Sequence, residues 1–288
     1  MKHWLGELPL AQSFWINYLF VNLAIYALYT WFENSPLYED FDLLSVRLWL
    51  GLMALNLVVW VWQIVGLWRS ARNHIITTNR FLWARSAQVI VVLGSMKVLA
   101  LLPAATEMSK VALGLDEFNE YTITLTDENT QVRVEGYIAF GLTEALRKEL
   151  DNAPLAWIIH LNSAGGYPAE SGRLHDLIRE KELTTYTATG CRSACTIAFL
   201  AGKERVLDEQ AKLGFHQASF TGLLYSNKLK EVDEAAKRYF LSASINPDFI
   251  EKAFSTPGDE MWYPALDVLI EAGVVTHTFD GFEILDWR

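Results

Sequence analysis

The chain has 288 residues, of which 51% are hydrophobic and 20% charged, so it is too apolar for a disordered protein and long enough for one large domain or two small ones. Residues 1–110 carry eight Lys/Arg and six Asp/Glu, whereas residues 111–288 carry sixteen and twenty-eight, so the net charge of −10 is the sum of +2 in the first part and −12 in the second. An acidic domain without a basic stripe argues against a nucleic-acid partner, and two cysteines are too few for a disulfide scaffold.

Three apolar stretches occupy the first 104 residues. Phe14–Phe32 and Leu48–Trp68 contain no charged residue, and the third stretch, about Leu82–Ala104, contains two basic ones. A helix needs about 20 apolar residues to cross a bilayer. Eight of the eleven tryptophans precede residue 105, several of them near the ends of these stretches, as in an interfacial aromatic belt. We predict that residues 1–105 form an all-α membrane anchor of three transmembrane helices; the alternative is a set of buried core helices.

The charges between the apolar stretches predict the orientation of this anchor. The first predicted loop holds the acids Glu33, Glu39, Asp40 and Asp42, and the second holds Arg69, Arg72, Arg80 and Arg85 without an acid. The positive-inside bias therefore places the second loop and the N-terminus in the cytoplasm. Three crossings then place the chain after about residue 105 outside. We expect a multi-pass protein of the cell (inner) membrane with a periplasmic or extracellular C-terminal domain and no cleaved signal peptide.

After residue 117 the periodicity becomes that of an α/β domain. Short β-branched or apolar runs predict strands at Tyr121–Leu125, Val132–Ile138, Ala156–Leu161 and Thr184–Ala188, with shorter ones at Val206 and Leu213–Phe215. Amphipathic or small-residue segments predict helices at Thr143–Leu150, Ala169–Lys181, Ala194–Ala201, Leu229–Phe240, Asp248–Phe254 and Pro264–Ala272. The continuous apolar run Ala156–Leu161 indicates a strand buried on both faces. The alternation predicts parallel strands stacked with helices over residues 120–288, after a juxtamembrane linker at 106–119.

Two loops of this domain carry candidate functional residues. Asn162–Gly166 (NSAGG) follows a predicted buried strand, and its two glycines allow a sharp turn and backbone N–H groups that approach a ligand closely. Gly190–Cys195 (GCRSAC) precedes an Ala-rich helix, so Ser193 is either an N-cap or a nucleophile beside the positive end of the helix dipole. Each loop alone is compatible with a purely structural turn.

A histidine completes the candidate constellation. His216 ends the apolar run Leu213–Phe215, where a strand can direct a side chain into a crevice. A lone histidine at such a place is often structural. A neutral imidazole is nevertheless the natural acceptor of a serine proton near pH 7.

Taken in order, these segments resemble the superfamily of the Clp protease proteolytic subunit and the crotonases over residues 130–285. The resemblance is carried by Val132–Leu161 (strand, helix and strand), Asn162–Gly166 (the family's Asn-Ser-Pro-Gly-Gly loop with Ala164 for Pro), Thr189–Gly202 around Ser193, Gly202–Arg205, His216-Gln217, and the closing element Ala265–Val275. Membrane-bound relatives of the signal peptide peptidase A and NfeD-associated type place a similar domain beside transmembrane helices. The resemblance implies a ClpP/crotonase-like fold.

The same resemblance implies acyl transfer by a Ser-His-Asp mechanism. Ser193 would attack a peptide carbonyl, His216 would carry the proton, and N–H groups of Gly165 or Gly166 and of Ala194 would hold the oxyanion. The acid is less well defined: Asp259 is preferred and Glu260 is next, although either can be a solvated turn residue. A Ser–Lys dyad is the mechanistic alternative, with the base supplied by Lys228, Lys230 or Lys237.

The two cysteines bracket Ser193. Cys191 and Cys195 stand at i and i+4, so on a helix their Cα atoms would lie about 6 Å apart, within disulfide range. Outside the cytoplasm they would be able to oxidise and fix the turn that directs Ser193; two buried thiols are the alternative. Nothing supplies further ligands at a familiar spacing, so we expect no metal, and no cofactor is implied.

We therefore expect a membrane-anchored serine endopeptidase that cleaves peptides or membrane-protein segments near the lipid bilayer, with homo-oligomerisation implied by the resemblance alone. The alternatives are a Ser–Lys peptidase of the same superfamily, crotonase-type acyl-CoA chemistry and a non-catalytic scaffold or binding protein. An outside-facing domain disfavours the acyl-CoA alternative because it would lack CoA.

Overall fold

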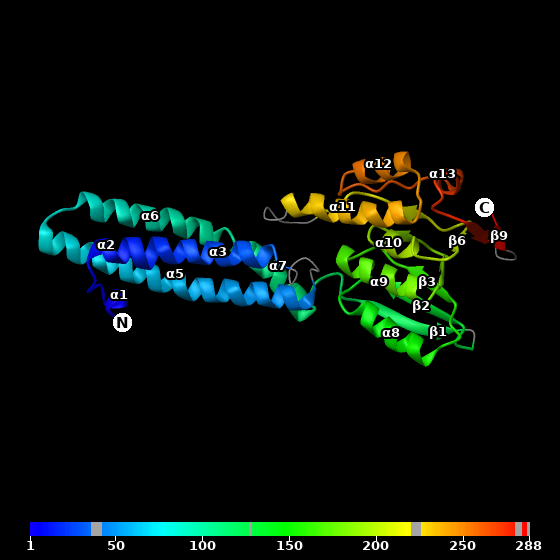
Figure 1. Cartoon of the computed structure of the whole chain (residues 1–288), viewed down its shortest axis with the longest axis horizontal. Helices are drawn as coiled ribbons and strands as arrows, with labels where there is room; N and C mark the ends of the chain where they lie inside the picture. Colours follow the sequence, from blue (N-terminus) through cyan, green and yellow to red (C-terminus); the bar gives the residue numbers. More distant parts are fainter. Residues whose placement is uncertain (36–41, 127, 220–225, 280–283, 287–288) are drawn as a thin grey trace. The chain divides into compact units, whose positions relative to one another are not determined.

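A computed structural model describes residues 1–35, 42–126, 128–219, 226–279 and 284–286. The chain divides into two compact units, Met1–Gly114 and Leu115–Arg288 (Figure 1). Glu39 and Asp40, which contribute to the predicted acidic loop, lie outside the described residues.

The described part of the first unit is helical. Its elements are α1 (Lys2–Leu5), α2 (Leu10–Gln12), the π-helix η1 (Ser13–Phe20), α3 (Val21–Glu33), α5 (Leu43–Thr78), α6 (Leu82–Leu99) and α7 (Leu102–Leu113). Figure 1 shows α3, α5 and α6 running side by side. Two segments, Leu43–Thr78 and Leu82–Leu113, are long and apolar enough to cross a membrane. The stretch Phe14–Phe32 is helical as well, but its first turns are π-helix.

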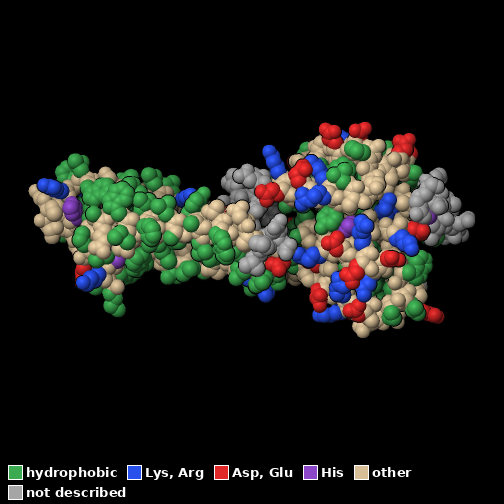
Figure 2. All heavy atoms as spheres, in the orientation of Figure 1, with side chains coloured by type: hydrophobic (Ala, Val, Ile, Leu, Met, Phe, Trp, Pro, Cys, Tyr) green, Lys and Arg blue, Asp and Glu red, His purple; other side chains and the backbone are tan. Residues whose placement is uncertain are grey.

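The surface of this unit is strongly apolar. Phe20, Val58 and Leu93 are 65%, 68% and 60% exposed, and Figure 2 shows hydrophobic side chains over most of the visible face. Soluble monomers rarely expose contiguous apolar patches of this kind. Many apolar side chains of these helices are therefore not covered by other residues of the same unit.

Two helix ends differ from the sequence-based expectation. α5 continues through Arg69 and Arg72 to Thr78 and ends where Asn79 adopts a φ of +54°, so the predicted basic loop is largely helix. The predicted linker is helical through Leu113, and Gly114 in the left-handed conformation ends α7. Composition identified the charged and polar ends of the apolar segments, but polar residues can continue a helix, so its end does not coincide with the end of the apolar run.

The second unit is a mixed α/β fold, as predicted. Its main sheet has the order β1-β2-β3-β4-β6-β8-β9. The strands are β1 (Tyr121–Thr126), β2 (Gln131–Gly136), β3 (Ile158–Asn162), β4 (Thr184–Thr187), β6 (Arg205–Asp208), β8 (His277–Phe279) and β9 (Ile284–Asp286). The strands from β2 to β8 pair in parallel, whereas β1 and β9 pair antiparallel at the two edges. The sequence did not predict β8 or β9.

A second, two-stranded parallel sheet pairs β5 (Cys191–Arg192) with β7 (Leu213–Gly214). An isolated parallel bridge joins Ser163 to Cys191, and an antiparallel bridge joins Phe215 to Trp262. These short pairings bring the Asn162–Gly166 loop, the segment around Ser193 and the segment around His216 to one place. The small sheet therefore positions the candidate site.

The described helices of this unit are α8 (Leu142–Asn152), α9 (Pro168–Glu180), α10 (Cys195–Phe199), α11 (Ser226–Ser242), α12 (Pro247–Ser255) and α13 (Leu266–Glu271) (Figure 1). α8 packs against β1 and α9, α9 also packs against α10 and α11, and α12 packs on α11. Alternate residues of β2 and β3 enter the core against α8 and α9; they are Val132, Val134, Ile159 and Leu161, none more than 1% exposed. Burying one such side chain contributes about 1.5–3 kcal/mol.

The opposite face of β3 differs from the prediction. Ile158 and His160 are only half-buried, and the His160 ring meets the edge of Tyr186 at 4.8 Å between centroids. The apolar run Ala156–Leu161 therefore belongs to a strand with one fully buried face. A continuous apolar run cannot distinguish this arrangement from burial on both faces, because half-buried strand positions also accept apolar residues.

Candidate active site

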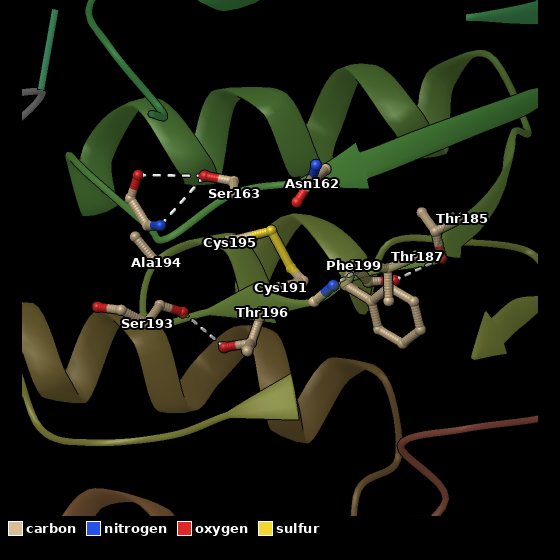
Figure 3. Close-up of a disulfide and its surroundings, with 12 residues drawn as sticks. Asn162, Ser163, Thr185, Thr187, Cys191, Ser193, Ala194, Cys195, Thr196 and Phe199 are labelled. Carbon is tan, nitrogen blue, oxygen red and sulfur yellow. Dashed lines mark hydrogen bonds between the residues drawn. A yellow bond between two sulfur atoms is a disulfide. The ribbon is translucent and has the colours of Figure 1, made fainter. Parts of the chain in front are cut away.

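Ser193 lies in the tight turn between β5 and α10, and its backbone is held in an uncommon conformation. Its φ of +54° is in the left-handed region, which costs a non-glycine residue about 1–3 kcal/mol. The Ser193 N–H donates to the Gly214 carbonyl at 2.9 Å, and its carbonyl accepts from the Thr196 N–H at 3.0 Å and the Thr196 hydroxyl at 2.8 Å. These contacts fix the turn and leave the Ser193 side chain to make its own contact (Figure 3).

A disulfide joins Cys191 and Cys195 across this turn, with their Cα atoms 5.4 Å apart and both residues fully buried (Figure 3). The i, i+4 spacing suggested that the two cysteines lie on one helix. In the structure they do not, because Cys191 belongs to β5 and α10 begins at Cys195. The bridge closes a loop with Ser193 at its centre and limits how far the turn can open.

The Ser193 hydroxyl contacts His216. The distance from Ser193 Oγ to His216 Nε2 is 2.7 Å, and that from His216 Nδ1 to the Gly258 carbonyl oxygen is 3.1 Å. A carbonyl oxygen only accepts hydrogen bonds, so Nδ1 carries the proton of the neutral ring. Nε2 is then the acceptor, and the Ser193 hydroxyl donates to it. This is the arrangement that a general base requires before it takes a serine proton.

The protonation state of His216 suits that task. Burial lowers the pKa of His216 below its ordinary value of 6.5, while the Gly258 carbonyl and the charge of Asp233 act in the opposite direction. The net shift is downward, so the imidazole is neutral at pH 7 and Nε2 is free to accept.

The segment Thr256–Trp262 holds His216 from one side. Phe215 and Trp262 exchange two backbone hydrogen bonds of 2.9 Å, and the Gln217 N–H donates to the Thr256 carbonyl at 3.0 Å. The sequence therefore indicated the segment that contacts the imidazole. The atom differs from the one expected, because the partner of Nδ1 is a backbone carbonyl.

The carboxylates of Asp259 and Glu260 do not take the place expected for the acid. Both residues are exposed, and neither forms a described hydrogen bond with His216. The N–H at Nδ1 already donates to the Gly258 carbonyl, and the neutral ring has no second N–H that a carboxylate could accept from. The expectation that Asp259 contacts His216 is not met in this structure.

Two of the three lysines considered as alternative bases have other surroundings. Lys237 pairs with Glu234 at 2.7 Å, and Lys230 is exposed. The side chain of Lys228 lies outside the described residues. The Ser193 hydroxyl already has an imidazole partner at 2.7 Å.

Two backbone N–H groups near Ser193 are candidates for an oxyanion hole. The N–H groups of Ala194 and Gly166 form no described hydrogen bond. The Ile138 N–H donates to the Gly165 carbonyl, and the Ile138 carbonyl accepts from the Tyr167 N–H. In this parallel bridge the Gly166 N–H therefore points away from Ile138. The Gly165 N–H instead donates to Ser163 Oγ at 3.1 Å (Figure 3). Of the two glycines considered, Gly166 therefore has the free donor.

Gly165 packs directly against the candidate nucleophile. Its φ is +111°, and a Cβ placed on it would lie 2.8 Å from Ser193 Cβ and 3.3 Å from the Ala194 nitrogen. No side chain fits there without displacing Ser193. The close approach gives a physical reason for glycine at this position.

A cavity opens beside Ser193 and His216. Its lining includes the apolar side chains of Ile197, Phe215, Ala236, Phe240 and Phe254, together with Asp233 of α11. Sequence analysis did not identify Asp233 or the carbonyls of Gly214 and Gly258. A signal for Asp233 existed, since the acid falls on the helix face that also carries Ala236 and Phe240.

No protein-family model and no curated protein sequence matches the chain. Among solved structures, the chain is similar to ClpP1 from Listeria monocytogenes, with 20% sequence identity and a TM-score of 0.45 over 53% of this chain and 92% of that chain. It is also similar to a point mutant of ClpP1 from the same organism, with 18% identity and a TM-score of 0.46 over 54% of this chain and 93% of that chain. Similarity at this level assigns no role to any residue.

Proposed function

We propose that the protein is a membrane-anchored serine endopeptidase in which Ser193 is the nucleophile and His216 the general base. The observation that carries the proposal is the 2.7 Å contact between Ser193 Oγ and the unprotonated Nε2 of His216. Two further observations support it. Ser193 has the strained backbone conformation that clusters at active sites, and a cavity opens beside its side chain.

The chemistry is acyl transfer to serine. As Ser193 Oγ attacks a peptide carbonyl carbon, its proton passes to His216 Nε2, and the resulting imidazolium gives that proton to the leaving amine. A water molecule then attacks the acyl-enzyme by the reverse sequence of proton transfers. The N–H groups of Ala194 and Gly166 hold the oxyanion, and losing one such donor typically raises the barrier by about 2.7–4 kcal/mol.

The first unit is proposed to anchor this domain in the cell membrane. Leu43–Thr78 and Leu82–Leu113 have the length and composition of membrane spans, and Phe14–Phe32 is proposed as a third. The N-terminus then faces the cytoplasm and the second unit faces the periplasm or cell exterior. The Cys191–Cys195 disulfide supports that side, since such bonds persist in oxidising compartments. Peptides or membrane-protein segments near the bilayer are the proposed substrates of a protein that forms homo-oligomers.

The test uses the full chain in detergent micelles and a fluorophosphonate probe, which reacts with an activated serine. We expect the unaltered chain to be labelled, Ser193→Ala to be unlabelled, and His216→Ala to be labelled at least about 100-fold more slowly because the general base is gone. Ser255→Ala is the matched control, since Ser255 is exposed at the end of α12 and bonds only its own helix.

Peptide hydrolysis is measured on the same samples with a mixture of unstructured peptides and mass spectrometry of the products. Internal cleavage by the unaltered chain and its loss in Ser193→Ala support an endopeptidase. Labelling that persists in Ser193→Ala refutes the proposed nucleophile. Absence of both labelling and cleavage in the unaltered chain favours a non-catalytic scaffold.

A further inference from the structure

Asp233 occupies an unusual place for a helix carboxylate. It is half-buried on α11 and lines the same cavity as Ser193 and His216. Its Oδ1 accepts the Ala218 N–H at 2.7 Å, two residues beyond His216. The carboxylate therefore fixes the chain that follows His216, whereas the Gly258 carbonyl bonds the imidazole ring itself.

Among the described residues, Asp233 is the charged group that acts on His216. The groups that act on Asp233 are Lys237, Glu234 and His216, and Glu234 and Lys237 pair with each other at 2.7 Å. Asp233 is the acidic residue among the described side chains that line the cavity, whose other lining is apolar or uncharged apart from His216 itself. The negative charge available to His216 is thus that of Asp233.

We propose that Asp233 is a positioning residue for His216, in the role that the sequence assigned to Asp259. The inference rests on the proposed function, because it concerns how the general base works. Asp233 fixes the segment after His216 through the Ala218 N–H, and its charge stabilises the imidazolium that forms when Ser193 gives up its proton. Nδ1 is already bonded to the Gly258 carbonyl, so the tautomer of the ring does not depend on the acid.

The electrostatics of Asp233 agree with that role. Burial raises the pKa of Asp233, while the Ala218 N–H, Lys237 and His216 lower it. A carboxylate that has lost part of its hydration gains most when a positive charge appears nearby. The imidazolium of the transition state is that charge, and it is absent in the resting enzyme. Asp233 therefore favours the transition state over the ground state.

The test compares Asp233→Asn with Asp259→Asn in the full chain in detergent. An Asn side chain keeps an oxygen that accepts the Ala218 N–H but removes the charge. Asp259→Asn is the matched control, because it makes the same change at an exposed residue next to Gly258. The rate of fluorophosphonate labelling of Ser193 is measured from acid to neutral pH, with Asp233→Glu as the variant that keeps the charge.

For Asp233→Asn we expect a plateau rate about 10-fold lower, as for the loss of one charge interaction close to the ring. We also expect the midpoint of the pH profile to move to lower pH, because removing the negative charge lowers the pKa of His216. Asp259→Asn should reproduce the unaltered profile, and Asp233→Glu should recover part of the plateau. A fall in the plateau without movement of the midpoint would indicate a structural role only and overturn the proposal.

The outcomes separate this inference from the proposed function. If the unaltered chain labels at Ser193 but Asp233→Asn behaves as the unaltered chain does, the inference fails and the peptidase assignment survives. If Asp259→Asn shows the shift expected of Asp233→Asn, Asp259 is the acid and the inference is refuted. If the unaltered chain does not label, both fail together.

Discussion

Replacing Gly165 with alanine tests whether the loop after β3 forms one wall of the site. The substitution has two effects. The φ of +111° is one that L residues rarely adopt, and the new Cβ would lie 2.8 Å from Ser193 Cβ and 3.0 Å from the Arg192 carbonyl oxygen. Gly141 provides the control, since its φ is +88° and nothing lies within 4 Å of a Cβ built on it. Gly141→Ala thus introduces the backbone strain without the collision.

The expected magnitudes follow from these two contributions. Backbone strain at a left-handed position costs about 1–2 kcal/mol, so Gly141→Ala should lower the melting temperature by about 2–8 °C. Gly165→Ala should lower it further, because the collision adds to the strain. Only Gly165→Ala should also move Ser193 and the Ala194 N–H. Losing the alignment of one oxyanion donor costs about 10²–10³ in rate, so Gly165→Ala should be labelled by a fluorophosphonate at least about 100-fold more slowly.

The assay follows thermal unfolding of the full chain in detergent and the labelling rate at Ser193. Gly141→Ala should retain a labelling rate within about threefold of the unaltered chain, since the added Cβ meets no atom within 4 Å and displaces no residue of the site. Equal losses of labelling in the two variants would mean that Gly165 acts only through stability. Full labelling of Gly165→Ala would refute the packing of this loop against Ser193.

Three further predictions concern pH, the disulfide and the membrane. Labelling should require neutral His216, so its rate should rise with pH and reach half its plateau below pH 6.5, the ordinary value that burial lowers; a midpoint above 6.5 would contradict the environment described. Replacing Cys191 and Cys195 together by alanine should destabilise the chain by about 2 kcal/mol, because closing the loop limits the unfolded state, and an unchanged melting temperature would argue against the bridge. The full chain should stay in the membrane pellet after alkaline carbonate and leave it in detergent; release by carbonate alone would exclude an integral anchor.

Much of the fold could be predicted because its signals are local. β-branched runs, amphipathic helices and glycine-rich turns predicted β1–β4, β6 and the helices α8–α13 within a few residues of their bounds. The strands β8 and β9 were missed because they are only three residues long. β8 forms by pairing with β6, which is distant in sequence, and β9 forms by pairing with β8, so neither strand leaves much pattern of its own. The antiparallel pairing of β1 with β2 and of β8 with β9 was not predicted, because the expected pairing was inferred from the strand–helix alternation, which indicates parallel strands.

The site residues likewise fall into those with a local sequence signal and those positioned by contacts between distant segments. Ser193 and His216 could be proposed from residue type and order, and the structure brings their side chains within 2.7 Å. The carbonyls of Gly214 and Gly258, which position these two residues, could not be proposed. Every residue has a backbone carbonyl, so the sequence does not indicate which one makes the contact. Asp233 was missed because it lies on a helix that connects to the site only through tertiary packing.

The most direct test of the account is an experimental structure of the full chain after reaction with a fluorophosphonate. We predict a phosphorus–oxygen bond at Ser193, the phosphoryl oxygen within about 2.7–3.1 Å of the Ala194 and Gly166 nitrogens, and His216 Nε2 within hydrogen-bond reach of the adduct. An adduct on another residue, or a phosphoryl oxygen directed away from both N–H groups, would contradict it.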